Sequence, residues 1–330
     1  MRQKVFVTRE IPEEGLERMK DAFDVRVWTE ETPPSKKQII EKAENCEGLV
    51  TLLSDSIDSE VIAAIPNLKV IAQYAVGYDN IDINAATSRK IMITNTPGVL
   101  TEATADLTWA LILAAARRVV EADNYIRGGK WKVAWGPKLL LGVDVFNATL
   151  GVIGMGRIGG AVARRAAGFS MRVIYYSRSE NDLTRLVEDE VGAERVDLET
   201  LLRESDIISI HVPLTEATAN LIGSKELRMM KKGCVLVNTS RGAVVDEDAL
   251  YDALSNNRLQ AAGLDVFRKE PINHQNPLLS LQNVVIAPHI GSASISARAK
   301  MARMCAENLI AGLRGQKPPN IVNPGVIENE

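Results

Sequence analysis

The sequence contains little of what marks a secreted, membrane-bound or metal-binding protein. Its three cysteines, Cys46, Cys234 and Cys305, lie far apart, so they form neither a metal motif nor a disulfide framework. We expect them to be core thiols in a reducing compartment, and we expect no metal site. No apolar run reaches the ~18 residues that a membrane span needs. The first residues also lack the apolar stretch of a signal peptide. These absences favour a cytoplasmic protein with no membrane partner.

The chain has no large excess of either charge. Its formal net charge is −3 over 330 residues, whereas a protein that mainly binds nucleic acid or an anionic membrane usually carries a basic surface. We therefore expect neither partner. The length is enough for two domains of ordinary size.

Three glycines near the middle of the chain have the spacing G-x-G-x-x-G. Gly154, Gly156 and Gly159 follow an apolar run at 150–153 and precede small and basic residues that suit a helix. Strand, glycine turn and helix in this order form the phosphate end of a dinucleotide fold. The helix N-terminus would present free N–H groups and partial positive charge to the pyrophosphate. A turn with a purely structural role is the alternative.

Patterns of strand and helix alternate twice along the chain. Over residues 4–95, short apolar runs alternate with helical segments, which predicts a parallel sheet covered on both faces. No glycine-rich turn follows the first run, so this lobe does not bind the nucleotide. Residues 150–287 repeat the alternation and predict six strands. Between the two sets we expect a hinge at 95–98 and one long helix over 101–125.

After Pro288 the pattern becomes helical again, and we expect this last helix to return to the first lobe. The predicted fold class is α/β, with two doubly wound parallel-sheet domains. A Rossmann nucleotide domain would span residues 100–288. A flavodoxin-like substrate domain would combine residues 1–99 with residues 289–330.

Three side chains with useful chemistry follow successive strands of the second set. Arg241, Glu270 and His289 come after the runs at 234–237, 261–266 and 284–287. The carboxyl ends of strands in a doubly wound sheet face the ligand crevice. Taken singly, Arg241 is also explained as a solvated arginine and Glu270 as a surface carboxylate.

Together, these three residues form the set that reduces a 2-oxo acid. A guanidinium holds the carboxylate and polarises the ketone through paired hydrogen bonds. A histidine gives a proton to the forming alkoxide while a nicotinamide supplies the hydride. A carboxylate beside the histidine fixes its ring and favours its charged form. General acid help of this kind contributes on the order of 10²–10⁴ in rate.

At this point the chain resembles the D-isomer-specific 2-hydroxyacid dehydrogenases, over nearly its whole length. The resemblance is carried by the glycine turn and by the segments at 239–242, 263–271 and 288–291, and its closest branch is the archaeal-type glyoxylate and hydroxypyruvate reductases. It implies an NAD(P)-dependent oxidoreductase that converts glyoxylate to glycolate or hydroxypyruvate to D-glycerate. Arg241 and His289 would bind substrate together with backbone N–H groups of Val76 and Gly77, and Glu270 and His289 would form the acid pair.

The resemblance also places Thr104, Thr239 and Asp265 near the nicotinamide, and it implies a homodimer that pairs through the nucleotide domain. The long helix beginning at Thr101 and the loop at 131–142 are the candidate interface. Two alternatives stay open: another dehydrogenase of the family, acting on D-3-phosphoglycerate or D-lactate, and a non-catalytic nucleotide-sensing protein of the corepressor type. The full set of residues expected to contact the cofactor is Thr104, Gly154, Gly156, Arg157, Ile158, Gly159, Ser177, Arg178, Ser179, His211, Pro213, Thr239, Ser240, Arg241, Asp265, His289 and Gly291.

The choice of cofactor depends on the end of the strand after the glycine turn. An acidic residue that binds the ribose of NAD should lie there, ~20 residues after the glycines. The chain instead has Ser177, Arg178 and Ser179, with no acidic residue before Glu180. These residues suit a 2′-phosphate, so we expect NADPH to be preferred and NADH to remain possible. The alternative is a solvated Arg178 and a site that takes either cofactor.

Overall fold

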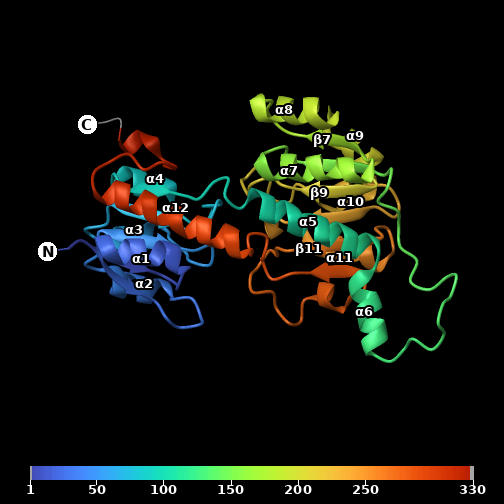
Figure 1. Ribbon diagram of the computed structural model, residues 1–330, viewed down its shortest axis with the longest axis horizontal. Helices are drawn as coiled ribbons and strands as arrows, with labels where there is room; N and C mark the ends of the chain where they lie inside the picture. The colour runs from blue at the N-terminus through green and yellow to red at the C-terminus, as the bar shows by residue number, and fades with distance from the viewer. Residues whose placement is uncertain (1, 328–330) are drawn as a thin grey trace. The chain divides into compact units, whose positions relative to one another are not determined.

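A computed structural model describes residues 2–327 of the chain. The chain divides into two compact units, Met1–Leu100 with Ser292–Glu330 and Thr101–Gly291 (Figure 1). Within the described residues, no helix combines the length and the apolar character that crossing a bilayer would require. Cys46, Cys234 and Cys305 are buried and unbonded to one another, which confirms the expectation of core thiols.

The first unit is a parallel sheet with helices on both faces. Its sheet has five strands in the order β2-β1-β3-β4-β5, the flavodoxin-like order. Helix α12 packs against α1 and against strands β3, β4 and β5, so the last helix does belong to the first lobe (Figure 1). The elements are β1 (Lys4–Val7), α1 (Glu13–Ala22), β2 (Asp24–Val27), α2 (Lys36–Ala43), β3 (Gly48–Thr51), α3 (Ser59–Ala64), β4 (Val70–Gln73), α4 (Ile83–Ser88), β5 (Met92–Thr94), α12 (Ile295–Leu313) and η4 (Pro324–Val326).

The second unit is a larger parallel sheet of seven strands in the order β12-β11-β10-β9-β6-β7-β8. Read from β8, this is the Rossmann order with β12 added at one edge. The elements are α5 (Thr101–Ala116), α6 (Val119–Arg127), β6 (Thr149–Ile153), α7 (Arg157–Ala166), η1 (Ala167–Phe169), β7 (Arg172–Tyr176), α8 (Asp182–Val191), β8 (Glu194–Arg195), α9 (Leu198–Glu204), β9 (Ile207–Ile210), α10 (Ser224–Met229), β10 (Val235–Asn238), η2 (Gly242–Val244), α11 (Glu247–Ser255), β11 (Ala261–Leu264), η3 (Pro277–Ser280) and β12 (Val284–Ile286). The predicted fold class is thereby confirmed.

The expectation of six strands in this unit was wrong. The additional strand, β8, has only two residues, both charged and exposed, so no apolar run marks it in the sequence. It forms because Arg195 pairs with Tyr175 of β7, and the N–H of Val196 donates to the Tyr175 carbonyl at 2.9 Å. Edge strands of this kind are short and charged because one side faces solvent.

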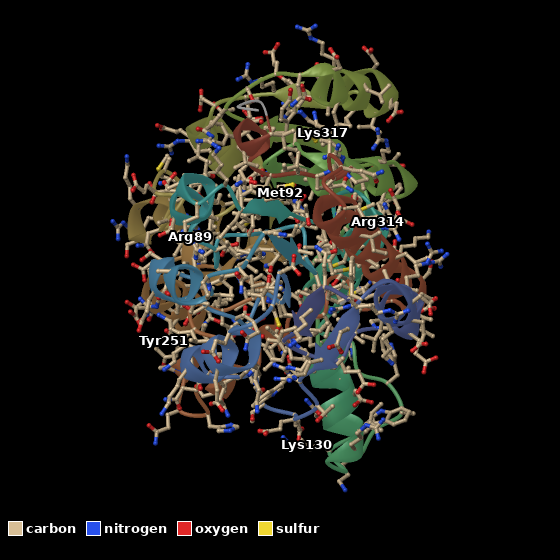
Figure 2. The ribbon with its side chains drawn as sticks, turned by 90° about the vertical axis from the view of Figure 1, so that its left-hand side faces the viewer. Arg89, Met92, Lys130, Tyr251, Arg314 and Lys317 are labelled. Atoms are coloured by element: carbon tan, nitrogen blue, oxygen red, sulfur yellow. The ribbon has the colours of Figure 1, made fainter. Side chains whose placement is uncertain are left out.

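The single helix expected over 101–125 is two helices. In a continuous helix the Ala116 carbonyl would accept the N–H four residues later. It accepts the N–H of Val143 instead, at 2.9 Å, and Arg118 adopts a left-handed φ of 53°. The chain therefore restarts as α6. None of the side chains of α6 is buried, and Figure 2 shows Lys130, which follows this helix, near its end.

Candidate active site

Each glycine of the central turn meets a different spatial requirement. Gly154 has a φ of 98°, and a Cβ there would lie 2.8 Å from the backbone of His211, at the point where the strand order reverses between β6 and β9. A Cβ on Gly159 would collide with the Gly154 carbonyl oxygen, so α7 can approach β6 only without one. A Cβ on Gly156 would meet no atom within 4 Å. The turn is tight inside and open on the side of Gly156.

The open side of the turn is the start of α7. Gly156 is its N-cap and provides no side-chain acceptor, so the N–H groups of Arg157 and Ile158 lie in the first turn, where a helix has no internal acceptors. Such a helix end binds anions through free N–H groups and the helix dipole. The residues present therefore fit the pyrophosphate of a dinucleotide, at the switch point where ligands bind to doubly wound sheets.

The loop after β7 is held by an arginine from the edge strand. Nη2 of Arg195 donates to the carbonyls of Ser177, at 2.9 Å, and Arg178, at 3.4 Å, while Nη1 pairs with Glu180. Ser177 Oγ donates to the Ser179 carbonyl at 3.1 Å. The sequence pattern predicted a role for Ser177, Arg178 and Ser179 but none for Arg195. Arg195 reaches this loop only because strand β8, which was not predicted, pairs with β7.

His211 and Pro213 follow β9 on the same edge of the sheet. His211 Nε2 lies 2.7 Å from Ser209 Oγ. Burial lowers the pKa of His211 to about 3, so its ring is neutral near pH 7 and suits a structural or contact role rather than proton transfer. The Pro213 carbonyl accepts a hydrogen bond from Thr218 Oγ1 at 2.6 Å, which braces the segment after the strand.

Several of the residues expected near the nicotinamide lie together between α5 and the sheet. Thr239 follows β10 and is buried, and its Oγ1 lies 2.9 Å from that of Thr108 on α5. Thr104 lies one helical turn earlier, and its carbonyl accepts from Thr108 Oγ1 at 2.8 Å. A Cβ on Gly291 would lie 3.2 Å from both Thr104 Cγ2 and Asp265 Oδ2. Thr108 was not predicted from the sequence, although its spacing of four from Thr104 places it on the same helix face.

The acid pair expected from the sequence is a direct contact. His289 Nδ1 lies 2.6 Å from Glu270 Oε2, and the other carboxylate oxygen accepts the N–H of Phe267 at 3.0 Å. Burial raises the pKa of Glu270, but the hydrogen bond and charge of His289, with a contribution from Arg241, outweigh it and hold that pKa below its usual value. An ionised carboxylate only accepts, so Nδ1 carries a proton and Nε2 is the ring atom left for another partner.

Arg241 follows β10 in an extended conformation, with a φ of −142°. Its carbonyl accepts from Asn238 Nδ2 at 2.9 Å, and its Nη1 donates to the Ser240 carbonyl at 2.8 Å. Ser240 is itself held by Asn238, whose Oδ1 accepts the Ser240 N–H at 3.0 Å. Arg241, Glu270 and His289 follow the neighbouring parallel strands β10, β11 and β12, so they share the C-terminal edge of the sheet. The charge of Arg241 also helps to lower the pKa of Glu270.

Asp265 holds the segment that carries His289. Its two carboxylate oxygens accept the N–H groups of Ile290 and Gly291, both at 2.7 Å, and its carbonyl accepts the N–H of His289 at 2.9 Å. Burial raises the pKa of Asp265, and the two N–H donors oppose that shift. His289 has a left-handed φ of 54°, which a residue with a side chain adopts only when its surroundings impose it. Asp265 supplies that constraint.

The loop expected to bind a carboxylate follows β4 in the first unit. Val76 and Gly77 are partly exposed. Within residues 2–327, the N–H groups of Val76 and Gly77 donate to no backbone or side-chain acceptor, whereas the Val76 carbonyl accepts from Asn95 Nδ2 at 2.8 Å. Adjacent backbone N–H groups without acceptors are the donors that backbone anion sites use.

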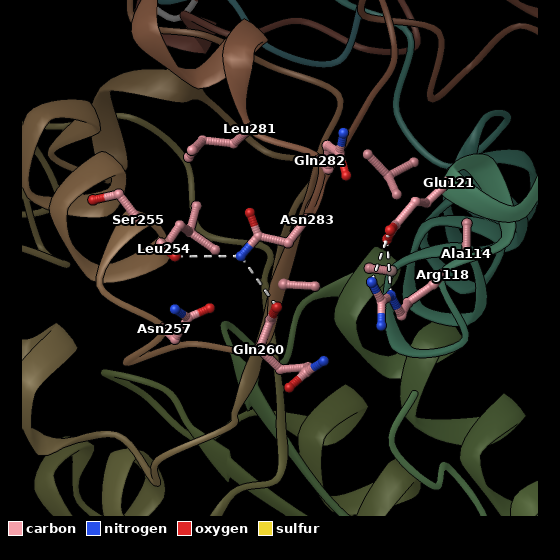
Figure 3. A pocket seen from close by; sticks show the side chains of 13 residues that line it. Ala114, Arg118, Glu121, Leu254, Ser255, Asn257, Gln260, Leu281, Gln282 and Asn283 are labelled. Atoms are coloured by element: carbon pink, nitrogen blue, oxygen red, sulfur yellow. Dashed lines mark hydrogen bonds and ion pairs between the residues drawn. The ribbon is translucent and has the colours of Figure 1, made fainter. Parts of the chain in front are cut away.

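The second unit also has a pocket of about 330 Å³ lined by Arg118, Glu121, Gln260 and Asn283 among others (Figure 3). It lies where β11 and β12 begin, whereas the residues described above follow the ends of the strands. It is therefore separate from the candidate site.

Within the described residues, no group of three or more histidine, cysteine, aspartate or glutamate side chains is placed to hold a metal ion.

Comparison with known proteins bears directly on this arrangement. The NAD-binding domain of the D-isomer specific 2-hydroxyacid dehydrogenases matches residues 109–291. The chain belongs to this family. The glyoxylate reductase of Korarchaeum cryptofilum is 58% identical over 328 residues, which cover 99% of this chain and 98% of that protein.

Solved structures agree with the family assignment. The TT0316 protein of Thermus thermophilus has a TM-score of 0.90 and 47% identity, and covers 97% of this chain and 100% of that one. The NADPH-dependent glyoxylate/hydroxypyruvate reductase of Sinorhizobium meliloti, solved with NADP and malonate, has a TM-score of 0.86 and 30% identity. The match covers 98% of this chain and 97% of that one. The predicted family is confirmed, in its glyoxylate reductase branch. This dehydrogenase is an NAD(P)-dependent oxidoreductase, and the matched segment contains Arg241, Glu270 and His289.

Proposed function

We propose that this dehydrogenase uses NADPH to reduce small 2-oxo acids, glyoxylate to glycolate and hydroxypyruvate to D-glycerate. The observation that carries the proposal is the 2.6 Å contact between His289 Nδ1 and Glu270 Oε2, on the same sheet edge as Arg241. The glyoxylate reductase of Korarchaeum cryptofilum, at 58% identity, supports the substrate class.

His289 is the proposed proton donor. Glu270 accepts from Nδ1, so the proton available for transfer lies on Nε2 of the charged ring. Nε2 donates it to the substrate oxygen as that oxygen gains negative charge. The bound nicotinamide supplies the hydride. Glu270 keeps the ring oriented through its contact with Nδ1.

Arg241 and the loop after β4 are the proposed substrate anchors. Arg241 polarises the 2-oxo group and binds the carboxylate through paired charge-assisted hydrogen bonds, each worth about 1.5–3 kcal/mol. The N–H groups of Val76 and Gly77 bind the carboxylate as well, which is supported by their lack of any acceptor among residues 2–327. Both anchors require a carboxylate next to the carbonyl, and glyoxylate is the smallest acid that satisfies them.

The preference for NADPH is proposed from the loop after β7. Ser177, Arg178 and Ser179 would bind the 2′-phosphate. The acidic residue that follows, Glu180, is paired with Arg195, so its charge is neutralised beside the phosphate site. The Sinorhizobium meliloti enzyme, NADPH-dependent by name, supports this choice.

We also propose a homodimer that pairs through the segment from α6 to Phe146. This segment exposes a run of large apolar side chains, which monomeric proteins rarely leave uncovered. Ile126 is 56% exposed, Trp131 52% and Trp135 76%. Aromatic residues of this kind are enriched where protein surfaces meet.

The direct test is turnover. Initial rates with NADPH are measured for glyoxylate, hydroxypyruvate, pyruvate and 3-phosphohydroxypyruvate, and we expect the first two to be reduced fastest. Arg241→Ala and His289→Ala should each lower kcat/KM for glyoxylate by at least about 10², because one binds the reacting group and the other protonates it.

The matched controls are Arg268→Ala and His274→Ala, which replace the same residue types at exposed positions of the same unit. Their rates should stay near that of the wild type. The proposed mechanism is wrong if Arg241→Ala and His289→Ala both leave turnover unchanged. A faster rate with 3-phosphohydroxypyruvate or pyruvate would move the assignment to another substrate of the family.

A further inference from the structure

Three successive carbonyls in the loop after β4 each accept a hydrogen bond from a different donor. Ala75 O accepts the N–H of Thr96 at 2.8 Å. Val76 O accepts from Asn95 Nδ2 at 2.8 Å. Gly77 O accepts from Gln73 Nε2 at 3.2 Å. All three carbonyls of the loop are therefore held from the same unit.

These bonds set the direction of the neighbouring N–H groups. In a planar trans peptide, the carbonyl of one residue and the N–H of the next point in opposite directions. The bond to Ala75 O thus orients the N–H of Val76, and the bond to Val76 O orients that of Gly77. Since neither N–H donates to another group among residues 2–327, both remain available to an anion, with their directions fixed by donors behind the loop.

Asn95 is itself held in place on both sides of its backbone. Its N–H donates to the Asn320 carbonyl at 3.2 Å, and its carbonyl accepts from Asn308 Nδ2 at 2.9 Å. Asn308 is fully buried on α12 and also accepts the N–H of Asn320 at 3.0 Å. The returning helix and the chain after it therefore fix the residue that orients the loop.

Gln73 is oriented by a second set of bonds. Its Oε1 accepts from Thr51 Oγ1 at 2.6 Å, which leaves Nε2 to face the loop. Nε2 also donates to Asn80 Oδ1 at 2.8 Å, and Asn80 Nδ2 donates to the Leu52 carbonyl at 3.0 Å. The side-chain amides of Asn95 and Gln73 therefore each present an N–H donor to a loop carbonyl. Turning either amide to face the loop with its oxygen would break that hydrogen bond.

We propose that Asn95 is a positioning residue for the substrate carboxylate, and that Gln73, by holding the Gly77 carbonyl, restrains the loop on the other side of Gly77. The inference rests on the proposed function, since it takes the carboxylate of a 2-oxo acid to bind at Val76 and Gly77. An aspartate at position 95 would fill the same space but would set a negative oxygen against the Val76 carbonyl. Only the amide provides both the shape and the donor.

The test compares Asn95→Ala and Asn95→Asp with the wild type, using the full chain. KM for glyoxylate should rise by about tenfold or more in both variants, with kcat changed by less than about threefold, because binding of the carboxylate is weakened in the ground and transition states alike. The Kd of NADPH should not change. Oxalate titrated into the NADPH-loaded protein should bind more weakly by a similar factor.

Asn323→Ala is the matched control. Asn323 is a buried asparagine of the same unit whose Nδ2 donates to the Ile91 carbonyl at 2.9 Å and whose Oδ1 accepts the N–H of Ile93 at 2.8 Å. Its loss should lower Tm without changing KM or oxalate binding. Gln73→Glu, which keeps the size of the side chain but loses the donor, is the second variant, and should raise KM in the same direction if Asn95 variants do not fold.

The inference is overturned if folded Asn95→Ala or Asn95→Asp keeps the wild-type KM and oxalate affinity, or if Asn323→Ala weakens both as much. Failure of the proposed function is a separate result, in which the wild type binds NADPH but does not reduce glyoxylate. Oxalate binding then still decides whether Asn95 positions a carboxylate site.

Discussion

Asp265→Asn tests how much of the activity depends on the placement of His289. The Asp265 carboxylate accepts two N–H groups at 2.7 Å, from Ile290 and Gly291, immediately after a histidine with a φ of 54°. An asparagine has only one oxygen for these two donors. Its NH₂ group would face the other N–H, so one buried donor would lose its acceptor and the segment that carries His289 would shift.

The size of the effect follows from the lost bond. A hydrogen bond to a charged group contributes about 1.5–3 kcal/mol. If this free energy holds His289 in its active position, the loss lowers kcat by about 10- to 150-fold, since 1.36 kcal/mol corresponds to tenfold in rate. The free energy of unfolding should fall by less, because the burial that raises the pKa of Asp265 penalises the charged carboxylate and the neutral amide avoids that penalty.

The assay is steady-state reduction of glyoxylate with saturating NADPH, together with urea unfolding. Asp206→Asn is the control. Asp206 accepts the N–H of Thr149, the first residue of β6, at 2.9 Å, and it also pairs with Lys231. It therefore lies at the opposite end of the strands from Asp265. Asp206→Asn should leave kcat near that of the wild type. An Asp265→Asn enzyme with wild-type kcat would refute the view that this carboxylate positions His289.

Three further predictions follow from the same unit. Arg178→Asp should reverse the cofactor preference toward NADH. Arg195→Met should lower the NADPH-to-NADH ratio of kcat/KM, whereas the control Arg172→Met, at the start of β7, should leave this ratio unchanged. An unchanged ratio in Arg195→Met would contradict the role of Arg195 in holding the loop. Glu270→Gln should lower kcat. The ionised Glu270 should stabilise the fold above pH ~4.5, and this contribution should be lost as the pH falls through the lowered pKa of Glu270. The free energies of unfolding in urea of the wild type and the variant should therefore become equal only in acid. Ile126→Glu with Trp135→Glu should yield a monomer in a sizing measurement while Leu186→Glu, on α8, leaves a dimer; a monomeric wild type would remove the proposed dimer.

The parts of this fold that could be predicted from sequence are those with a strong local signal. The buried strands read as apolar runs because both faces of a parallel sheet are covered. The glycines at 154 and 159 were predictable because a Cβ at either position would collide with neighbouring backbone. Arg241, Glu270 and His289 could be associated because the carboxyl ends of parallel strands meet at one edge, although their roles stay predictions.

The features that were missed depend on contacts between distant segments. The end of α5 is set by Val143, which takes the Ala116 carbonyl from 27 positions further along the chain. The strand β8 forms only by pairing with β7, since its two charged residues have no pattern of their own. Arg195 acquires its role from that pairing. A method that reads periodicity along the chain has no access to such partners.

The two units leave the backbone N–H groups that we propose to bind anions free in two different ways. In the second unit, the first N–H groups of α7 are free because a helix provides no acceptor for them, and Gly156 leaves the space before them open. In the first unit no helix supplies the free donors, so the carbonyls of the loop must be bound elsewhere if its N–H groups are to point outward. Thr96 and Asn95 hold the carbonyls of Ala75 and Val76, and Gln73 holds that of Gly77. Asn95, the first residue of the expected hinge, therefore has a role that its turn-like Asn-Thr-Pro-Gly segment does not indicate.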